Sequence, residues 1–419
     1  MKTVALRRLA EVNPPSPEFD RLSDEDDVLF LPLETVWSDS KGDQTRLLPK
    51  AAVASGYTRF HAGDVVTPKV TPTFQAGRSM LTVRTGAGTT ELHVLRARPG
   101  IDARWISYAV RSKHFLEEGV TAFQGVAGLQ RVPAEFVADF RIADVDAGEQ
   151  RRIADFLDDR VARIDQIITA RQGQVALLEA TAARMSYEAV TGAKVPGQRR
   201  STDLAWLGDV PSEWPLLTVA SQFQVDLGKM LDEKRQTGGH VIPYLRNTNV
   251  QWDMIDTDDL KAMDIALEER SRYTVKPGDL LICEGGQPGR GAIWTGSLSP
   301  LGYQKALHRA RTRGRSRPTW LLECLRTAVS LNVFAIENEQ TTIGHLTNEQ
   351  LRSLRFPFPD TEVQDRLLVD VAQTRKQVVQ AVEALRRSSA LLAEYKQALI
   401  TAAVTGEIDV TTAGSGIPG

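Results

Sequence analysis

The chain has 419 residues, of which 42% are hydrophobic and 25% are charged, and its formal net charge is −2. These proportions are ordinary for a soluble globular protein, and the length suggests about three domains. No stretch approaches 18 uncharged apolar residues and no apolar run follows Met1, so we expect neither a membrane span nor an export signal. The two cysteines form no Cys-x-x-Cys pair, which favours a reducing cytoplasm.

Residues 1–148 are predicted to form a first domain of the α+β class. Apolar runs predict strands at 28–36, 63–67 and around 92–97, and a short helix is expected to begin near Ala103 and to carry Trp105. Short strands mixed with short helices are typical of an α+β domain.

Residues 149–195 are predicted to form a long helix with a heptad pattern. The segment lacks proline, and Gly192 follows it where a helix end favours a residue that tolerates positive φ. At 1.5 Å per residue, a helix of roughly 40 residues would be about 60 Å long. Its apolar residues recur at a spacing of three and four, with charged residues elsewhere: Val161, Ile164, Ile168, Val175, Leu178, Ala182, Met185 and Ala189.

The second half of the chain repeats this plan. Residues 196–361 form a polar linker and a second α+β domain, residues 362–410 form a second long helix, and residues 411–419 form a flexible tail. The two helices align without a gap from Gln150/Gln364 to Gly192/Gly406, and segments of the two domains match at nearly the same offset. The sequence therefore predicts an internal duplication of one unit, a domain followed by a long helix. Two unrelated surface helices are the alternative, and the ungapped register disfavours them.

The duplication predicts how the helices pair. Neither apolar stripe can be buried alone, and the ends of a domain usually lie close together, so the second helix should run back antiparallel along the first. The expected fold is two pseudo-symmetric α/β domains separated by two long antiparallel coiled-coil helices.

The middle of each domain is basic although the whole chain is nearly neutral. Residues 285–322 contain seven Lys or Arg and no acidic residue, and residues 65–90 also contain no acidic residue. A local positive field suits phosphate binding, whereas a solvated edge strand protected by Lys and Arg is the alternative. The residues predicted to meet phosphates are Lys69, Arg84, Arg96, Arg98, Lys305, Arg309 and Arg311.

A second set of polar residues lies on loops of both domains. The segments QAGR at 75–78 and QPGR at 287–290 place Gln and Arg on glycine-containing loops. Gln can pair with adenine and Arg with guanine in the major groove, although an Asn in a turn more often caps the backbone. The residues predicted to lie near bases are Gln75, Arg78, Arg246, Asn247, Asn249, Gln287 and Arg290.

The sequence offers no catalytic pattern. The six histidines lack metal-ligand spacing. The glycine-containing segments GAGTT at 86–90 and GG at 285–286 lack the Gly-Lys-Ser/Thr ending of a phosphate loop. The segment NPPS at 13–16 lacks the aromatic residue of the amino-methyltransferase motif. We therefore expect no catalytic residue, metal or cofactor in this chain.

The chain resembles the specificity subunit of type I restriction-modification systems over nearly its whole length. The motifs that carry the resemblance are WLGDVPSEW at 206–214, IPYLR at 242–246, GDLL at 278–281 with GR at 289–290, TTIGHL at 341–346, FPFP at 356–359 and EQ at 149–150. The first domain lacks the WLG opening, and it carries PLE at 32–34 where the second has RNT at 246–248. The second helix begins with EVQ in place of EQ.

The resemblance implies a non-catalytic, cytoplasmic DNA-binding subunit. Each domain would be a target recognition domain that reads one half of a bipartite, asymmetric site in double-stranded DNA. The helices would set the spacing and dock two methyltransferase subunits, which hold S-adenosylmethionine and methylate adenine. Restriction subunits that use ATP and magnesium would join them. Two alternatives stay open at this point: a coiled-coil adaptor whose two heads bind protein, and an enzyme of unfamiliar type.

Overall fold

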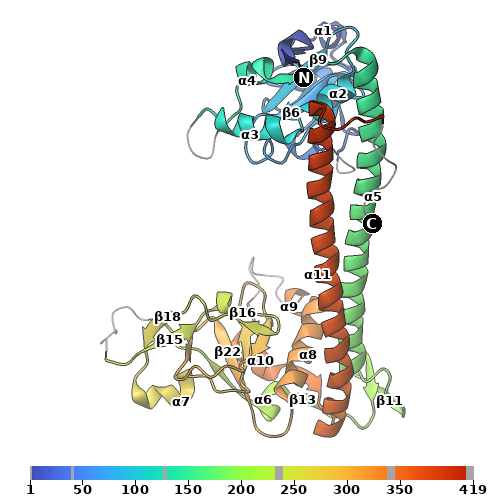
Figure 1. Cartoon of the computed structure of the whole chain (residues 1–419). Helices are drawn as coiled ribbons and strands as arrows, with labels where there is room; N and C mark the ends of the chain where they lie inside the picture. The colour runs from blue at the N-terminus through green and yellow to red at the C-terminus, as the bar shows by residue number, and fades with distance from the viewer. Residues whose placement is uncertain (1, 39–41, 126–129, 232–238, 337–344, 412–419) are drawn as a thin grey trace. The chain divides into compact units, whose positions relative to one another are not determined.

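The computed structural model describes residues 2–38, 42–125, 130–231, 239–336 and 345–411. The chain divides into two compact units, Met1–Gln174 with Ala384–Gly419, and Val175–Glu383. Each unit combines one head of strands and short helices with parts of two long helices, α5 (Ala147–Val190) and α11 (Thr361–Thr405) (Figure 1). Head 1 is the part of the chain before α5, and head 2 is the part between α5 and α11.

Head 1 is built on two four-stranded sheets. In the first sheet the order is β2 (Ala10–Val12), β9 (Leu92–Ala97), β6 (Val65–Pro68) and β7 (Met80–Leu81), all antiparallel. In the second it is β4 (Leu47–Pro49), β3 (Asp27–Leu31), β8 (Gly86–Gly88) and β5 (Thr58–Phe60), with β3 and β8 parallel. The strand β1 (Thr3–Ala5) pairs with β10 (Arg141–Ala143). The helical segments are η1 (Leu6–Arg8), α1 (Pro17–Arg21), η2 (Leu33–Thr35), η3 (Lys50–Val53), α2 (Ala103–Ala109), α3 (Lys113–Thr121) and α4 (Ala134–Asp139).

Head 2 repeats this arrangement. Its four-stranded sheet has the order β14 (Phe223–Leu227), β22 (Leu307–Thr312), β19 (Leu280–Cys283) and β20 (Gly291–Ile293). Its second sheet has the order β18 (Lys261–Asp264), β15 (Val241–Leu245) and β21 (Gly302–Tyr303), with β15 and β21 parallel. Three further pairs are β11 (Arg199–Ser201) with β12 (Asp209–Pro211), β13 (Leu216–Thr218) with β23 (Arg355–Pro357), and β16 (Val250–Gln251) with β17 (Met254–Ile255). The helical segments are α6 (Val219–Gln222), η5 (Asn247–Asn249), η6 (Leu267–Glu269), α7 (Arg270–Tyr273), α8 (Pro318–Ser330), α9 (Val333–Ile336) and α10 (Asn348–Ser353).

Buried polar contacts recur at equivalent positions of the two heads. The ring of His93 is buried and donates from Nε2 to the carbonyl oxygen of Val132 at 2.9 Å, and His308 makes the same contact with Leu346 at 2.7 Å. Burial lowers the pKa of both rings, to about 4 for His93, so both stay neutral at physiological pH.

A buried glutamine fastens the start of each long helix to its head. Gln150 donates to Val145 O at 2.9 Å and accepts from the backbone N of Asp102 at 3.1 Å. Gln364 donates to Pro359 O at 2.7 Å and accepts from the backbone N of Arg317 at 2.9 Å. Because Asp102 and Arg317 are the N-cap residues of α2 and α8, each glutamine joins two helix starts.

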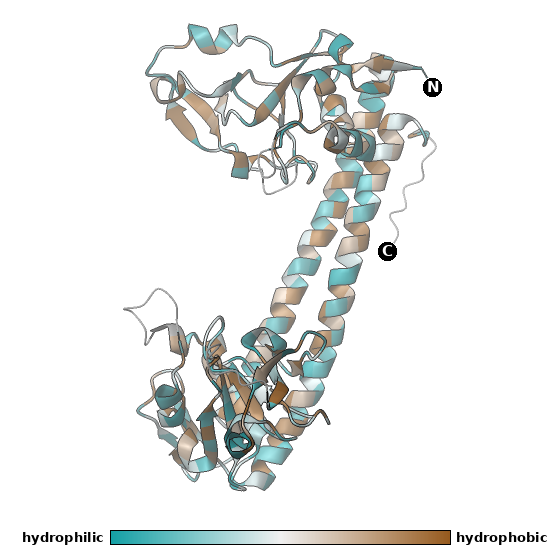
Figure 2. Cartoon of the chain, turned by 90° about the vertical axis from the view of Figure 1, so that its left-hand side faces the viewer, coloured by the Kyte–Doolittle hydropathy of each residue, from teal (hydrophilic) through white to brown (hydrophobic). Residues whose placement is uncertain are grey.

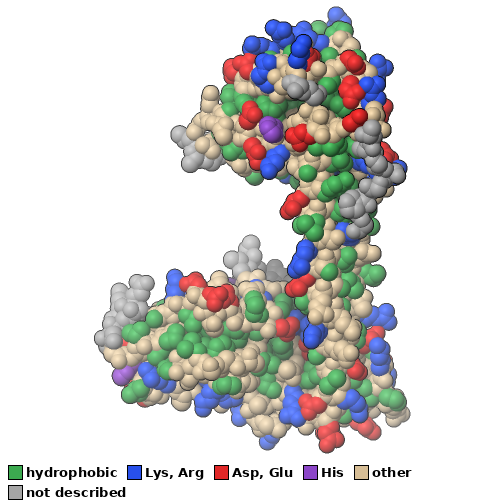
Figure 3. Space-filling model, viewed as in Figure 1, with side chains coloured by type: hydrophobic (Ala, Val, Ile, Leu, Met, Phe, Trp, Pro, Cys, Tyr) green, Lys and Arg blue, Asp and Glu red, His purple; other side chains and the backbone are tan. Residues whose placement is uncertain are grey.

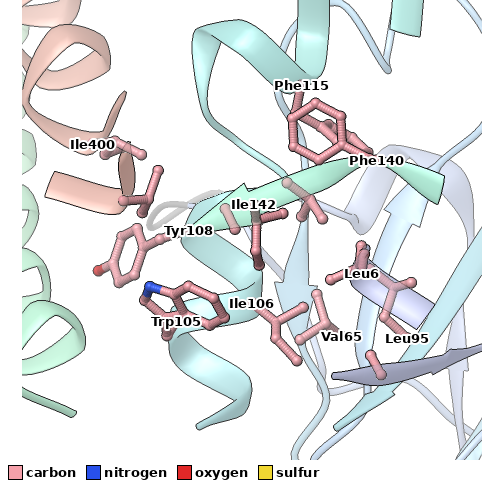
Figure 4. Packing of buried hydrophobic residues seen from close by; sticks show 14 of the residues in the cluster. Leu6, Val65, Leu95, Trp105, Ile106, Tyr108, Phe115, Phe140, Ile142 and Ile400 are labelled. Atoms are coloured by element: carbon pink, nitrogen blue, oxygen red, sulfur yellow. The ribbon is translucent and has the colours of Figure 1, made fainter. Parts of the chain in front are cut away.

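The core of unit 1 joins head 1 to both long helices. Trp105 and Ile106 of α2 are fully buried and pack with Leu95 of β9, and Ile400 of α11 and Leu157 of α5 belong to the same cluster. Figure 4 shows the side chains of α2 between the sheet and the α11 residue Ile400. The apolar seams of α5 and α11 therefore continue into the core of head 1.

Within each unit, α5 and α11 run antiparallel, as predicted. In unit 1, Lys396 contacts Asp165 at 2.6 Å, and Arg171 donates to Ser388 further along α5. In unit 2, Arg375 donates to Ser186 Oγ at 2.8 Å and pairs with Glu323 of α8. Along both helices the predicted seam positions are buried or half-buried, and Figure 2 shows brown and teal residues alternating along them.

Both long helices end before the predicted positions, α5 at Val190 and α11 at Thr405. Gly192 and Gly406 follow with φ of 62° and 75°, which confirms the predicted left-handed residues at both ends. The predicted strand at 28–36 also ends early, at Leu31, because the backbone turns at η2.

No helix in the described part of the chain is both long enough and apolar enough to cross a lipid bilayer. The predicted tail lies outside the described residues except for Thr411, as do residues 341–344 of the TTIGHL motif.

Candidate nucleic-acid interface

In each head, a short 3-10 turn lies against a glycine-containing loop. The turn η2 or η5 follows the strand that pairs in parallel, and the loop connects β6 to β7 or β19 to β20. In head 2 the turn and the loop are joined by two hydrogen bonds, from Asn247 Nδ2 to Gly285 O at 2.8 Å and from Arg290 Nη2 to Asn247 O at 3.2 Å. In head 1 the guanidinium of Arg78 lies 3.5 Å from the ring centroid of Trp37, just beyond η2. The residues predicted to lie near bases therefore gather at one place in each head.

The turn of head 2 is closed by Asn249, which is 3% exposed. Its Oδ1 accepts from the backbone N of Arg246 at 2.9 Å, and its Nδ2 donates to Asp259 O at 3.3 Å. The prediction that Asn249 lies near a base is therefore withdrawn, because its polar atoms cap the backbone.

Arg246, at the start of the same turn, is held by an acidic neighbour. Its guanidinium contacts Asp259 Oδ2 at 2.6 Å and the carbonyl oxygen of Asp259 at 2.7 Å. The hydrogen bond from Arg246 lowers the pKa of Asp259. A base contact by Arg246 would have to compete with this ion pair.

Asn247 and Arg290 each keep one polar atom without a partner among the described residues. These atoms are Asn247 Oδ1 and Arg290 Nε, and both are buried. Gln287 is exposed at the tip of the loop, and Gly289 turns the loop with φ of 86°. A Cβ at Gly289 would lie 2.5 Å from Phe334 Cε2, so glycine is needed there on two counts.

Head 1 presents the equivalent residues with different neighbours. Gln75 is exposed, and Gly77 turns the loop with φ of 63°. Arg78 stacks on Trp37, whereas Arg290 donates to the turn of its own head. Trp37 is a functional candidate that the sequence analysis missed, because it lies beyond the end of the predicted strand. The signal available was an indole in the otherwise polar segment WSDS.

Three of the predicted phosphate contacts form ion pairs that are buried or half-buried within the fold. Arg96 binds both carboxylate oxygens of Asp64 at 2.9 and 2.7 Å, and Arg311 binds both oxygens of Asp279 at 2.7 and 2.6 Å. Arg309 is 0% exposed, with Asp226 Oδ2 at 2.5 Å. The prediction that Arg309 meets a phosphate is withdrawn, because no solvent reaches its side chain.

The same residues decide against the edge-strand alternative. Arg309 and Arg311 lie on β22, which pairs with β14 on one side and β19 on the other. Arg96 lies on β9, which pairs with β2 and β6. These arginines occupy interior strands, so their charge does not protect a sheet edge.

The remaining basic candidates lie at or near the surface. Arg84, Arg98 and Lys305 are exposed, and Arg98 contacts Glu11 at 3.2 Å. Lys69 is half-buried and donates to Thr90 O at 3.0 Å, and burial lowers its pKa. On the face drawn in Figure 3, basic and acidic side chains are interspersed in both heads.

Among the described residues, no group of three or more His, Cys, Asp or Glu side chains could hold a metal ion. Both cysteines are buried, and burial raises the pKa of each thiol.

Comparison with known proteins supports the resemblance drawn from the sequence, although no family model matches the chain. The specificity subunit of the type I restriction enzyme EcoAI from Escherichia coli is 34% identical over 154 residues, 35% of this chain and 26% of that protein. The EcoEI specificity subunit from the same organism is 29% identical over 170 residues, 39% of this chain and 28% of that protein. This chain thus matches about a quarter of the length of each curated relative.

Solved structures match along almost the entire chain. A chain from a structure of a type I restriction-modification system, described for its complex assembly and conformational transition, has a TM-score of 0.73 and 17% identity. The match covers 97% of this chain and 98% of that one. The HsdS subunit from Thermoanaerobacter tengcongensis has a TM-score of 0.53 and 16% identity, with 97% of each chain covered. The resemblance to type I specificity subunits is confirmed, and so is the predicted fold class.

Proposed function

We propose that this chain is the DNA sequence-specificity subunit of a type I restriction-modification complex. The observation that carries the proposal is the full-length structural match, together with curated relatives that are type I specificity subunits. The duplicated fold supports it, because two similar heads suit a site made of two half-sites.

In this proposal each head reads one half-site through its turn and loop. The side chains available for base contacts are Gln75 and Arg78 in head 1, and Asn247, Gln287 and Arg290 in head 2. The exposed residues Arg84, Arg98 and Lys305 would add phosphate contacts, and half-buried Lys69 would join them by releasing its hydrogen bond.

The long helices would dock the other subunits of the complex. Several apolar side chains on them remain exposed, among them Leu177, Val369 and Leu391. Exposed apolar side chains on otherwise polar helices suit contact with another protein. We propose two methyltransferase subunits as partners there, joined by restriction subunits.

Chemistry would then belong to the partners. S-adenosylmethionine would be held by the methyltransferase subunits, and ATP with magnesium by the restriction subunits. This chain would be non-catalytic and would work in the cytoplasm, where the host DNA lies.

Mapping methylated adenines in the DNA of a host tests the proposal. The host would express this chain together with the methyltransferase subunit encoded in the same genome as the chain. A second culture would express the methyltransferase alone. We expect methylation at one bipartite, asymmetric sequence in the first culture only. Methylation without sequence preference, or equal patterns in both cultures, would contradict the proposal.

Duplex binding by the purified complex tests the adaptor alternative. DNA recognition predicts an affinity that falls steeply as salt rises, because phosphate contacts release counterions. If the complex bound no duplex at low salt, heads that bind protein would be the better explanation.

A further inference from the structure

We infer that Arg78 is a specificity-determining residue of head 1, and that it reads a guanine through its two terminal nitrogens while Trp37 holds its guanidinium flat. The inference deepens the proposed function and rests on it. Arg78 differs from the ion-paired arginines of head 1 in how its donors are used.

Several arginines of head 1 bind acidic side chains within the protein. Arg96 binds Asp64 and the carbonyl oxygen of Pro15, Arg98 binds Glu11, and Arg131 binds both oxygens of Glu91. Arg78 forms neither an ion pair nor a side-chain hydrogen bond with any residue that the structure describes. Its Nε is buried without a partner.

Trp37 stabilises this guanidinium without using its donors. Arg78 Cζ lies 3.5 Å from the ring centroid, which places the guanidinium directly over the indole. Such stacking contributes roughly 0.5–2 kcal/mol. It also restricts the orientation of the planar set of guanidinium N–H donors, which we call the fork. The indole is itself fixed, because its Nε1 donates to Glu34 O at 2.8 Å in η2.

The backbone on both sides of Arg78 is fixed as well. Thr67 Oγ1 donates to the carbonyl oxygen of Arg78 at 3.1 Å. Phe74 is 1% exposed and packs on Phe115, with ring centroids 5.6 Å apart, which anchors the start of the loop. The Arg78 fork is therefore held in advance, and a ligand would not have to order it.

The chemistry of the fork selects the ligand. Two parallel N–H donors match the O6 and N7 acceptors of guanine in the major groove, which is the commonest specific contact of arginine. Gln75 is exposed three positions earlier on the same loop and would face the neighbouring base pair or a phosphate. A phosphate could also accept two hydrogen bonds from the fork, and the experiment separates these two ligands.

The test compares methylation maps of hosts that express the methyltransferase with the wild-type chain, Arg78→Ala, Arg78→Lys or Trp37→Phe. For Arg78→Ala we expect preference for guanine at one position of one half-site to fall about tenfold or more, with the other half-site unchanged. Arg78→Lys keeps the charge but loses the fork, so the same position should relax. Trp37→Phe keeps an aromatic face, so it should relax that position less than Arg78→Ala does.

Two comparisons make the outcome decisive. Arg84→Ala removes an exposed cation without a stacked ring and should weaken methylation at all sites alike. Arg290→Ala should relax a position in the other half-site. If the methylation maps of both Arg78 variants match the wild-type map, the inference is overturned. A uniform loss of methylation at all sites, without relaxed base preference at any position, would also overturn it and would indicate a phosphate contact. A wild-type chain that directs no sequence-specific methylation would instead overturn the proposed function. If Arg78→Ala does not fold, Arg78→Lys and Trp37→Phe decide the matter.

Discussion

At the scale of single residues, arginines of these heads differ in whether an acidic side chain binds their guanidinium. Arg96 and Arg311 are bound to aspartates whose side chains are 2% exposed, and these aspartates also accept backbone N–H groups from His61 and Lys276 at 2.7 Å. Removing the cation leaves a buried carboxylate without its main partner, which is far costlier than removing an exposed pair. These arginines therefore stabilise the sheets, whereas Arg78 lacks an acidic partner among the described residues.

We predict that Arg311→Met lowers the free energy of unfolding of the full chain by roughly 3–5 kcal/mol, because it leaves Asp279 buried and unpaired. Thermal unfolding measures the change. The matched control is Arg317→Met, which breaks an exposed pair with Asp365 and should change the melting temperature little. The salt dependence of duplex binding by the complex should stay as in the wild type. A stable Arg311→Met chain with a reduced salt dependence would instead assign Arg311 to phosphate binding.

We predict that stability falls on acidification because His93 must stay neutral in the fold. Its folded pKa of about 4 lies below the usual 6.5, so the unfolded chain binds the proton first as pH falls. Stability is then fully present above pH 6.5 and declines toward pH 4, by about 2 kcal/mol between pH 7.5 and pH 5.

Urea unfolding of the wild-type chain and of His93→Gln at both pH values checks this prediction. The variant can still donate to Val132 O, and it has no proton to take up in this range. We expect a smaller difference between the two pH values for His93→Gln. Equal differences for both proteins would mean that other groups cause the acid sensitivity.

At the scale of elements, Gly173 within α5 and Gly192 just beyond its end have opposite roles. Gly173 lies mid-helix, and apart from its chain neighbours and the adjacent backbone of its own helix no atom lies within 4 Å of the position that a Cβ would occupy, whereas Gly192 follows the helix end with φ of 62°. A Cβ at Gly192 would lie 2.7 Å from Trp214 Cη2 and 2.8 Å from Pro211 Cγ. The end of α5 is thus packed against Pro211 and Trp214 of head 2.

We predict that Gly192→Ala and Gly173→Ala change stability in opposite directions. Gly173→Ala should stabilise the chain by roughly 0.5–1 kcal/mol, because alanine loses less backbone entropy in a helix. Gly192→Ala should destabilise it, because the new methyl group meets both packed rings and the backbone is left-handed. Melting temperatures of the two variants provide the measurement. A neutral or stabilising Gly192→Ala would show that the helix end can move.

Periodic elements could be predicted from the sequence, and contacts between distant segments could not. The heptad spacing of Val161 and Ile164 and the glycines after both helices depend only on local pattern, and they were predicted correctly. Strand ends were wrong where the backbone turns, as at Pro32, which has no N–H to continue the ladder.

The candidate site was harder to predict because charge in a sequence does not show its partner. Arg309 and Arg311 alternate along β22 and therefore lie on one face of the strand. The aspartates that neutralise them, Asp226 and Asp279, lie far away in the chain and were not identified. The role of Trp37 likewise depends on a loop some forty residues later, which sequence spacing alone does not reveal.

At the scale of the whole molecule, the duplication extends to matched internal contacts. The pairs Arg96–Asp64 and Arg311–Asp279, and the glutamines Gln150 and Gln364, occupy equivalent places in the two heads. The turn and loop share a place but not their side chains, with Trp37 and Arg78 in one head and Asn247 and Arg290 in the other. Under the proposed function, a shared scaffold with different side chains at the turn and loop would suit two unlike half-sites of an asymmetric site.

Under the proposed function, the length of the paired helices sets the spacing between the half-sites. Contacts of Arg171 with Ser388 and of Asp165 with Lys396 give the register of the two helices in unit 1. Residues 168–174 of α5 then face residues 386–392 of α11. Deleting both segments removes two helical turns from each helix and keeps the apolar seam in phase.

Such a paired deletion should shorten the spacer while leaving both half-sites unchanged. Seven helical residues span about 10 Å, which corresponds to about three base pairs at 3.4 Å per step. Size-exclusion chromatography first establishes that the deleted chain still binds the methyltransferase, and a methylation map then gives the site. Deleting only 168–174 leaves the two helices unequal and should abolish sequence-specific methylation. If the helices set the distance, a shorter pair of helices cannot hold the two reading surfaces at the original separation. An unchanged spacer in the paired deletion would therefore show that the helices do not set the distance.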